Sequence, residues 1–289
     1  MKKRVMIGVL LIVCVVWLPA HTVFAYSNIV AFGDSLSDNG NIERATNGCV
    51  WVEYLADDDR LDADLFNFAH AGATTGFSLQ RPYGLVTQAI GSWILSYFYP
   101  TFTEDALFTV WAGGNDLRGI DDPADAPAVI GSAVTNIATT LTILIEGVGA
   151  DDILVPNLPD LGLIPENNWN PQLSAMCSAA TLAFNTALDD TLDLFAVQYP
   201  TVNLYRLDTY AVMYEIIDDG IFENVTDPWL GSGGDPDEYL FYDSIHPTTA
   251  AHSILADYAY AAVTEVPEPA TLILMGVALL GFAVLRRKL

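Results

Sequence analysis

The chain has 289 residues, of which 52% are hydrophobic and 16% are charged, and its formal net charge is −25. This apolar content excludes an intrinsically disordered protein. Residues 26–264 contain five arginines, no lysine and 34 acidic residues, which gives that segment a net charge of −29. Such an acidic surface repels phosphate backbones, so nucleic-acid binding is excluded as well.

The first 25 residues have the three parts of a secretory signal peptide. A basic start (MKKR) precedes an apolar run over 5–18, and Val23–Ala25 resembles a signal-peptidase cleavage site. The apolar run has about 14 residues, which is fewer than the roughly 20 that a membrane-spanning helix needs. We therefore predict a leader over 1–25, removed by signal peptidase, and a mature chain that begins at Tyr26.

Residues 265–289 form a second terminal segment with a different pattern. Pro267–Pro269 (PEP) precedes an uncharged apolar run over 270–285, and three basic residues follow. Basic residues on that side favour a cytoplasmic C-terminus, with the rest of the chain outside. The order resembles the PEP-CTERM sorting signal, which implies removal by an exosortase during export to the envelope or extracellular matrix of a Gram-negative bacterium. Within this tail, 270–285 is expected to be a short transmembrane segment that spans the membrane transiently. The alternative to the sorting signal is a plain C-terminal anchor.

Residues 26–264 contain no repeat, linker or low-complexity stretch, and their number suits one domain. Short apolar runs alternate with longer helical patterns. We predict strands over 28–32, 65–68, 107–111, 153–155 and 202–207, and helices over 85–99, 126–146, 173–198 and 248–263. This alternation predicts a parallel sheet covered by helices on both faces, with active residues at the C-terminal ends of the strands.

The first polar motif, FGDSLSDNGN, occupies residues 32–41. Ser35 directly follows the first predicted strand and opens a helix. This position presents its hydroxyl beside backbone N–H groups and the positive end of the helix. A helix N-cap is the alternative role for such a serine. Asp34 and Asp38 are expected to cap and shape the same loop, without a chemical role.

Two further motifs follow the second and third predicted strands. NFAHAGATT (67–75) contains Gly72, whose backbone can come close to a ligand. WAGGND (111–116) contains Asn115, whose side-chain amide offers two donors. Each motif taken singly is equally typical of an ordinary turn.

The last motif, DSIHP, begins at Asp243 and stands just before the final helix. Asp243 and His246 are three residues apart. This spacing lets a carboxylate hold one ring nitrogen while the other nitrogen accepts a proton from a hydroxyl. His70 and His252 are the other histidines of the domain, and His252 is expected on the helix surface or in a structural role.

Together these motifs resemble those of the GDSL or SGNH hydrolase family. They occur in the family's order from residue 32 to residue 252, with NLPDLGLIP (157–165) between the third and the last. The resemblance implies a flavodoxin-like three-layer α/β/α sandwich with a five-stranded parallel sheet over 26–264. One departure is His70-Ala71, where many relatives have a smaller residue and a glycine. The loop that contains Gly72 is therefore expected to differ in shape from that of those relatives.

The resemblance also implies roles for individual residues. Ser35 would be the nucleophile, His246 the general base and then acid, and Asp243 the residue that orients the histidine. The oxyanion hole would consist of the backbone N–H groups of Ser35 and Gly72 and the side-chain amide of Asn115. The reaction would be hydrolysis of an ester through an acyl-enzyme, with no metal and no cofactor.

The substrate stays open at this point. Aromatic residues in 84–102 and 220–242 could grip acyl chains or sugar rings, or could belong to the core. A lipase, a simple carboxylesterase and a deacetylase of acetylated exopolysaccharide are all compatible with the motifs. A rival of another class is a non-catalytic, matrix-associated binding protein on the same fold, although the complete set of motif residues argues against it.

Two smaller features complete the sequence. Cys49 and Cys177 allow either one disulfide or two free thiols, since an oxidising compartment permits the bond without requiring it. Asp57–Asp59 is expected to form a solvated part of the surface.

Overall fold

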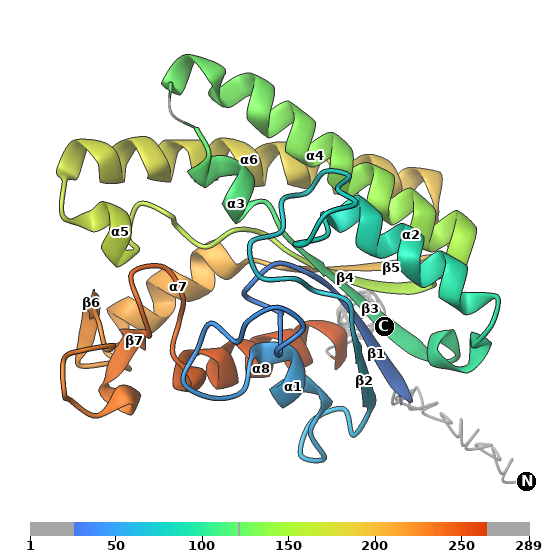
Figure 1. Ribbon diagram of the computed structural model, residues 1–289, viewed down its shortest axis with the longest axis horizontal. Helices are drawn as coiled ribbons and strands as arrows, with labels where there is room; N and C mark the ends of the chain where they lie inside the picture. Colours follow the sequence, from blue (N-terminus) through green and yellow to red (C-terminus); the bar gives the residue numbers. More distant parts are fainter. Residues whose placement is uncertain (1–25, 121, 265–289) are drawn as a thin grey trace, which may run out of the picture.

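A five-stranded sheet forms the centre of the computed structural model, which describes residues 26–120 and 122–264 (Figure 1). The predicted leader and the predicted sorting tail lie outside the described residues. The strands are β1 (Asn28–Gly33), β2 (Asp64–Asn67), β3 (Ala106–Trp111), β4 (Asp152–Pro156) and β5 (Asn203–Leu207). They lie in the order β2-β1-β3-β4-β5, and every neighbouring pair is parallel.

Burial explains the composition of the central strands. All six residues of β1 and all six of β3 are buried, because helices cover both faces of the sheet. The strand order reverses beside β1, whose neighbours are β2 on one side and β3 on the other. In sheets of this kind ligands bind at such a reversal, just beyond the C-terminal ends of the strands.

Helices form a layer on each face of the sheet (Figure 1). α2 (Leu85–Ser96), α4 (Ala126–Thr142) and α6 (Pro171–Gln198) pack side by side on one face. α1 (Trp51–Ala56) and α8 (Thr249–Thr264) pack together on the other, with α7 (Thr209–Asp218) beside α8. The prediction of a three-layer α/β/α sandwich around a five-stranded parallel sheet is therefore confirmed.

The long predicted helices are present with small changes at their ends. The helix expected over 85–99 ends at Ser96, and α6 begins two residues earlier than expected, at Pro171. The helix expected over 126–146 is α4 as far as Thr142 and then continues as a π-helix, Ile143–Val148. The part Pro123–Val148 is long and apolar enough to cross a membrane. It packs in the core instead, with Ile130, Ile137 and Leu141 buried.

Short elements between the predicted ones escaped the sequence analysis. They are α1, α7, α3 (Gly114–Arg118), α5 (Pro165–Asn168), and the 3-10 turns η1 (Pro100–Thr103), η2 (Pro123–Asp125) and η4 (Pro236–Glu238). A second sheet of two strands, β6 (Asn224–Pro228) and β7 (Tyr239–Phe241), also lies outside the prediction. All of these elements except α7, which has 10 residues, have three to six residues, and these are too few to show a periodicity.

Candidate active site

Ser35 lies in a tight turn directly after β1. The prediction that it opens a helix is wrong, because the next helix, α1, begins only at Trp51. Gly33 must be a glycine, because a Cβ built there would stand 2.3 Å from the carbonyl oxygen of Trp111 on β3. The buried side chain of Gln88 on α2 clamps this residue: Gly33 N donates to Oε1 at 2.9 Å, and Nε2 donates to Gly33 O at 2.8 Å. The backbone just before Ser35 is thereby confined by β3 on one side and held by α2 on the other. The sequence analysis missed Gln88, which lies outside every motif.

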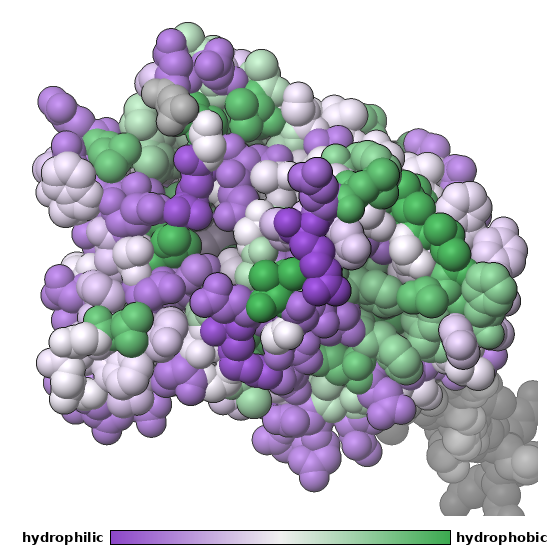
Figure 2. All heavy atoms as spheres, in the orientation of Figure 1, coloured by the Kyte–Doolittle hydropathy of each residue, from purple (hydrophilic) through white to green (hydrophobic). Residues whose placement is uncertain are grey.

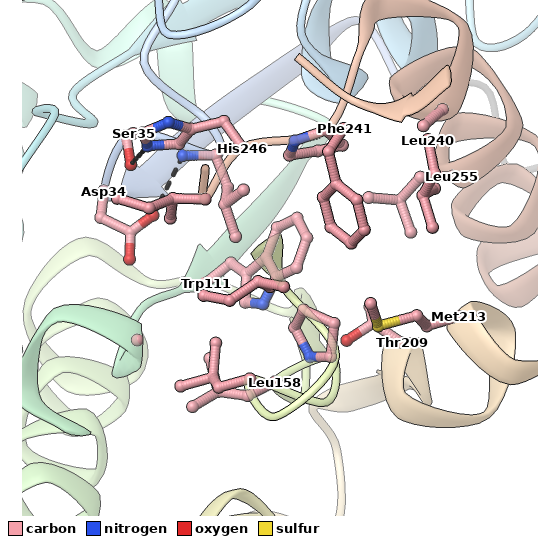
Figure 3. Close-up of a pocket in the computed structure, with 18 of the residues that line it drawn as sticks. Asp34, Ser35, Trp111, Leu158, Thr209, Met213, Leu240, Phe241, His246 and Leu255 are labelled. Carbon is pink, nitrogen blue, oxygen red and sulfur yellow. Dashed lines mark hydrogen bonds between the residues drawn. The ribbon is translucent and has the colours of Figure 1, made fainter. Parts of the chain in front are cut away.

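The structure brings Ser35 together with His246 (Figure 3), and His246 with Asp243. Ser35 Oγ is 2.8 Å from His246 Nε2, although the two residues are 211 positions apart. His246 Nδ1 lies 2.8 Å from Asp243 Oδ2 and 3.0 Å from Oδ1. With Nδ1–H donating to the carboxylate, Nε2 is left as the acceptor for the serine hydroxyl.

The carboxylate of Asp243 is also held by backbone donors. Asp243 Oδ1 accepts the N–H groups of Ile245 at 2.8 Å and His246 at 2.7 Å. Burial by itself raises the pKa of Asp243, but the hydrogen bonds from the ring and backbone of His246 outweigh it and hold that pKa below its usual value. Asp243 is therefore an anion that faces the ring of His246 at neutral pH.

Two of the predicted oxyanion-hole residues have unpaired backbone N–H groups. Within the described residues, the backbone N–H groups of Ser35 and Gly72 donate to no protein acceptor. Gly72 has a φ of +80°, a conformation that strongly favours glycine. Asn115 Nδ2 donates one hydrogen to Ala73 O at 2.9 Å, and the second hydrogen of the amide has no protein acceptor among these residues.

Carboxylates from neighbouring loops fix the Gly72 loop. Asp38 is fully buried, and its Oδ2 accepts the N–H of Ala71 at 2.7 Å. Asp116 accepts both the N–H of Thr75 at 2.9 Å and its hydroxyl at 2.8 Å. The loop after β2 is thus tied to the loop after β1 on one side and to α3 on the other.

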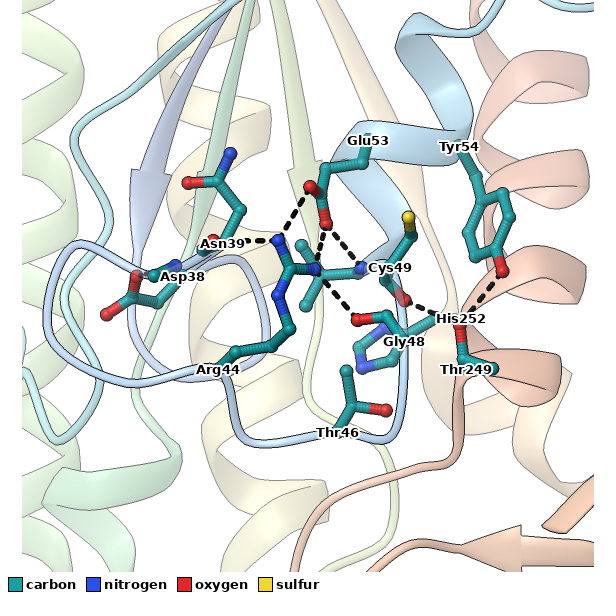
Figure 4. A network of polar contacts seen from close by, with 12 residues as sticks. Asp38, Asn39, Arg44, Thr46, Gly48, Cys49, Glu53, Tyr54, Thr249 and His252 are labelled. Carbon is teal, nitrogen blue, oxygen red and sulfur yellow. Dashed lines mark hydrogen bonds and ion pairs between the residues drawn. The ribbon is translucent and has the colours of Figure 1, made fainter.

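A second set of contacts joins the loop that follows Ser35 to the start of α8 (Figure 4). Arg44 donates to the carbonyls of Asn39 and Gly48, both at 2.8 Å, and forms a two-pronged ion pair with Glu53. The loop so folded contacts the start of α8: Thr249 Oγ1 donates to Cys49 O at 3.0 Å. These contacts fix the start of α8 relative to the loop that follows Ser35.

The same two segments meet at two more points. Thr46 Oγ1 donates to Pro247 O at 3.0 Å, and Thr249 N donates to Asn47 Oδ1 at 2.9 Å. Pro247 directly follows His246 in the sequence. The distance between Ser35 and His246 therefore depends on contacts that no sequence motif reveals.

Residues 29–259 of the chain match the family described as GDSL-like Lipase/Acylhydrolase. The chain belongs to this family. The match includes all five predicted site residues, and residues 265–288 match the PEP-CTERM protein-sorting motif, which is typical of exported proteins of Gram-negative bacteria.

Individual relatives of this GDSL-family chain carry several activities in their names. Lipase 1 of Photorhabdus luminescens is 30% identical over 157 residues, which are 49% of this chain and 24% of the relative. The thermolabile hemolysin of Vibrio parahaemolyticus is 26% identical over 276 residues, covering 80% of this chain and 62% of the relative. The chain thus spans from about a quarter to less than two thirds of these two relatives.

A solved structure supports the fold alone. It is a catalytic mutant of an acetylxylan esterase from Geobacillus stearothermophilus, with a TM-score of 0.51 and 14% identity. The alignment covers 83% of this chain and 95% of that chain.

An apolar cavity of about 110 Å³ opens beside Ser35 and His246 and runs inward (Figure 3). Its mouth includes Asn115 and Arg118. Its inner wall is formed by side chains from α7, α8 and β7, and nearly all of them are hydrophobic: Val212, Met213, Ile216, Leu240, Phe241 and Leu255. A GDSL-family chain with such a cavity next to its serine has room for a short hydrocarbon chain.

Asp34 is the charged group buried at the mouth of this cavity. Its side chain is 3% exposed, and Oδ1 accepts the N–H of Leu36 at 3.0 Å. Burial raises the pKa of Asp34 to about 6, against the opposing influence of that hydrogen bond and of His246. The predicted capping role fits this contact.

Arg118 stands at the same mouth and is paired with Glu166 on α5. Arg118 Nε and Nη2 donate to the two carboxylate oxygens at 2.8 and 2.9 Å. The backbone N–H of Glu166 also donates to Ser244 O at 2.8 Å, within the loop between Asp243 and His246. The ion pair therefore connects α3, α5 and the histidine loop across the rim of the cavity.

The remaining histidines have structural roles. His252 is 1% exposed and accepts the N–H of Trp51 through Nδ1 at 3.3 Å, and burial lowers its pKa to about 3. Of the two expected positions for His252, the structural one is observed and the surface one is wrong. His70 accepts the N–H of Tyr83 at 3.0 Å and stacks on its ring, which closes the base of the Gly72 loop.

The structure also describes the two cysteines of the domain, the acidic run and the arrangement of potential metal ligands. Cys49 and Cys177 are both free thiols. Asp57–Asp59 is exposed, as expected. Among the described residues, no group of three or more histidine, cysteine, aspartate or glutamate side chains is arranged to hold a metal ion.

Proposed function

We propose that this chain is an exported serine hydrolase that cleaves carboxylic esters through an acyl-enzyme. The observation that carries the proposal is the hydrogen bond of 2.8 Å between Ser35 Oγ and His246 Nε2, with Asp243 on the other ring nitrogen. A serine is a weak nucleophile at neutral pH, and a neighbouring base that removes its proton makes it reactive.

In the first half of the reaction, Ser35 Oγ attacks the ester carbonyl carbon and its proton passes to His246 Nε2. The anionic carboxylate of Asp243 stabilises the imidazolium that forms. His246 then gives this proton to the departing alkoxide oxygen, so that an alcohol leaves and the acyl group stays on Ser35. In the second half, water takes the place of the serine, and the carboxylic acid is released.

The negative charge of each tetrahedral intermediate falls on the former carbonyl oxygen. The unpaired N–H groups of Ser35 and Gly72 and the free amide hydrogen of Asn115 are the donors available to it. They are fixed before the reaction by the loop contacts of Asp38 and Asp116. Each such donor is typically worth about 10²–10³ in rate.

The cavity favours a short acyl chain. An apolar cavity of 150 Å³ can hold benzene, which has six carbons, so about 110 Å³ has room for about four. A butyryl group exceeds an acetyl group by two methylenes, and at about 0.8 kcal/mol each their burial corresponds to roughly 15-fold in kcat/KM. We therefore propose esters of short fatty acids as the preferred substrates.

A second candidate substrate is an acetylated exopolysaccharide. It is favoured by the sorting motif over 265–288 and by a 24% identical relative, the acetylesterase of Thermothelomyces thermophilus, matched over 73% of this chain and 74% of the relative. In that case acetyl esters are hydrolysed fastest and longer chains give no gain.

A chain-length series separates these candidates. We expect hydrolysis of p-nitrophenyl esters to rise from acetate to butyrate and to fall for chains longer than the cavity. A maximum at acetate, together with release of acetate from acetylated polysaccharide, favours the deacetylase. If no ester of the series is hydrolysed, the non-catalytic binding protein is the better explanation.

The role of Ser35 is tested by Ser35→Ala with Ser244→Ala as the matched control. Ser244 is exposed in the histidine loop, and no hydrogen bond of its hydroxyl occurs among the described residues. We expect Ser35→Ala to lose nearly all activity without loss of stability and Ser244→Ala to keep it. Retention of more than about a tenth of the rate by Ser35→Ala would contradict the nucleophile assignment.

The proposed export has its own test. Mass spectrometry of the protein from its host should find a chain that begins at Tyr26 and lacks the residues after Pro267–Pro269. This outcome supports the division into a leader over 1–25, a hydrolase domain over 26–264 and a sorting tail over 265–289. A C-terminus at Leu289 would indicate that 270–285 is retained as an anchor.

A further inference from the structure

Large apolar side chains cluster at the C-terminal end of α2 and just beyond it. Figure 2 shows apolar residues gathered over this helix, on the right of the view. Six of the seven residues from 93 to 99 are large, hydrophobic or aromatic, and more than a third exposed: Trp93, Ile94, Leu95, Tyr97, Phe98 and Tyr99. We call these six residues the aromatic end of α2. Exposed apolar patches of this kind mark interaction sites.

The aromatic end of α2 is remote from the ester site. It leads through η1 into the first residue of β3, whereas Asn115 follows the last residue of that strand. Six residues of strand separate the two edges of the sheet by about 20 Å. These aromatic side chains therefore do not grip the substrate, and their exposure removes them from the core. The core role suggested for the aromatic residues of 84–102 holds for the buried Phe102 and is wrong for the aromatic end of α2.

Both ends of the domain lie at the same edge of the sheet as this cluster. At the N-terminal end, Asn28 Nδ2 donates to the carbonyls of Thr101 and Glu104, so β1 begins beside η1. At the C-terminal end, α8 starts three residues after His246 and runs for 16 residues. That is about 24 Å away from the catalytic edge (Figure 1).

The sequence that continues from these two ends is apolar on both sides. Only five residues, 265–269, separate Thr264 from the apolar run over 270–285. Five residues reach at most about 18 Å. A bilayer that holds 270–285 is therefore close to this edge of the sheet, at which the described chain also begins, with Tyr26.

We infer that the aromatic end of α2 docks into the interface of a lipid bilayer and turns the catalytic edge away from it. Trp and Tyr are enriched at membrane interfaces, where their rings meet both hydrocarbon and water. The attraction is apolar, since no lysine or arginine occurs between residues 82 and 117 and the domain is strongly acidic. The partner is therefore a neutral or zwitterionic lipid surface.

The test measures the orientation of the full chain on vesicles of phosphatidylcholine. In a background with Cys14, Cys49 and Cys177 changed to serine, a bimane label is attached at Phe98→Cys or, as the control, at Leu230→Cys. Leu230 is also exposed and apolar, but its N–H donates to Tyr242 O, directly before the catalytic aspartate. Ester hydrolysis by each labelled protein verifies its fold independently of the membrane.

We expect doxyl-labelled lipids to quench the label at position 98 several-fold more strongly than the label at position 230. Replacing half of the phosphatidylcholine with phosphatidylserine should not increase the quenching. The inference is overturned if both labels are quenched equally, if position 98 is not quenched, or if the chain does not float with the vesicles. It is also overturned if the label at 98 is already shielded from water without vesicles, because the tail or a second copy then covers the cluster.

Discussion

Replacing Asp34 with asparagine removes a charge that is buried next to Ser35 and keeps the shape of the side chain. The amide oxygen of the substituted side chain can still accept the N–H of Leu36, so the turn after β1 is preserved. The side chain of Asp34 is 3% exposed, and no ion pair of this residue occurs in the described part of the chain. The difference in the free energy of unfolding between wild type and variant therefore measures how much the ionised carboxylate destabilises the folded state.

The magnitude follows from the pKa of Asp34, which burial raises from 3.8 to about 6. Each unit corresponds to about 1.4 kcal/mol, so the ionised carboxylate destabilises the folded state by about 3 kcal/mol. Below about pH 4 the carboxyl is protonated in both the folded and the unfolded chain, and the cost is absent. The contribution of Asp34 to the free energy of unfolding therefore falls as the pH rises from about 4 to about 6, and Asp34→Asn lacks this contribution.

The assay is urea unfolding of the full chain at about pH 8 and about pH 4, with Asp38→Asn as the matched control. Both oxygens of Asp38 accept backbone N–H groups, two each at 3.0 Å or less, and an amide nitrogen cannot accept any. At pH 8 we expect Asp34→Asn to stabilise by about 3 kcal/mol and Asp38→Asn to destabilise by a similar amount. No gain for Asp34→Asn at pH 8, or the same gain at both pH values, would refute the reasoning.

Three further predictions concern the pair of His246 and Asp243, the cavity and the stability in acid. Asp243→Asn should lower kcat for p-nitrophenyl butyrate by up to about 10⁴, and His246→Ala should lower it more, because the second change removes the base and the first only its orienter. Met213→Trp fills the end of the cavity away from Ser35, so the ratio of butyrate to acetate hydrolysis should fall while acetate hydrolysis persists. Burial lowers the pKa of His252 to about 3, so the contribution of this residue to wild-type stability decreases as the pH drops from about 6.5 towards 3. His252→Gln should flatten this dependence in urea unfolding, and an unchanged slope would argue against it.

The sequence was sufficient for the sheet because its strands are buried on both faces. β1 and β3 are continuous apolar runs, and such runs stand out even without periodicity. The candidate site was also predictable, since Ser35, Gly72 and Asn115 each follow a strand and the ends of parallel strands share one edge of the sheet. His246 needed the family resemblance, because nothing in its local sequence shows which strand end it reaches.

The supporting contacts could not be predicted, because they join residues that are distant in sequence. The side chain of Gln88 hydrogen-bonds with Gly33 from 55 positions away, and the cavity wall combines α7, α8 and β7. Hydrophobicity marks Met213 and Leu255 as buried, but the space between them depends on how three elements pack. The roles predicted for the aromatic residues of 93–99 were wrong for a different reason. Composition alone cannot distinguish a core side chain from an exposed one.

The contacts of Asp38 have a consequence for protein engineering. Its carboxylate accepts N–H groups from its own loop, at Gly40, Asn41 and Ile42, and from Ala71 in the loop that carries Gly72. Grafting either loop from a relative therefore replaces only half of a shared hydrogen-bonded unit. Chimaeras of this protein should keep the proposed ester hydrolysis when the loops after β1 and β2 are exchanged together, and lose it when one loop is exchanged alone.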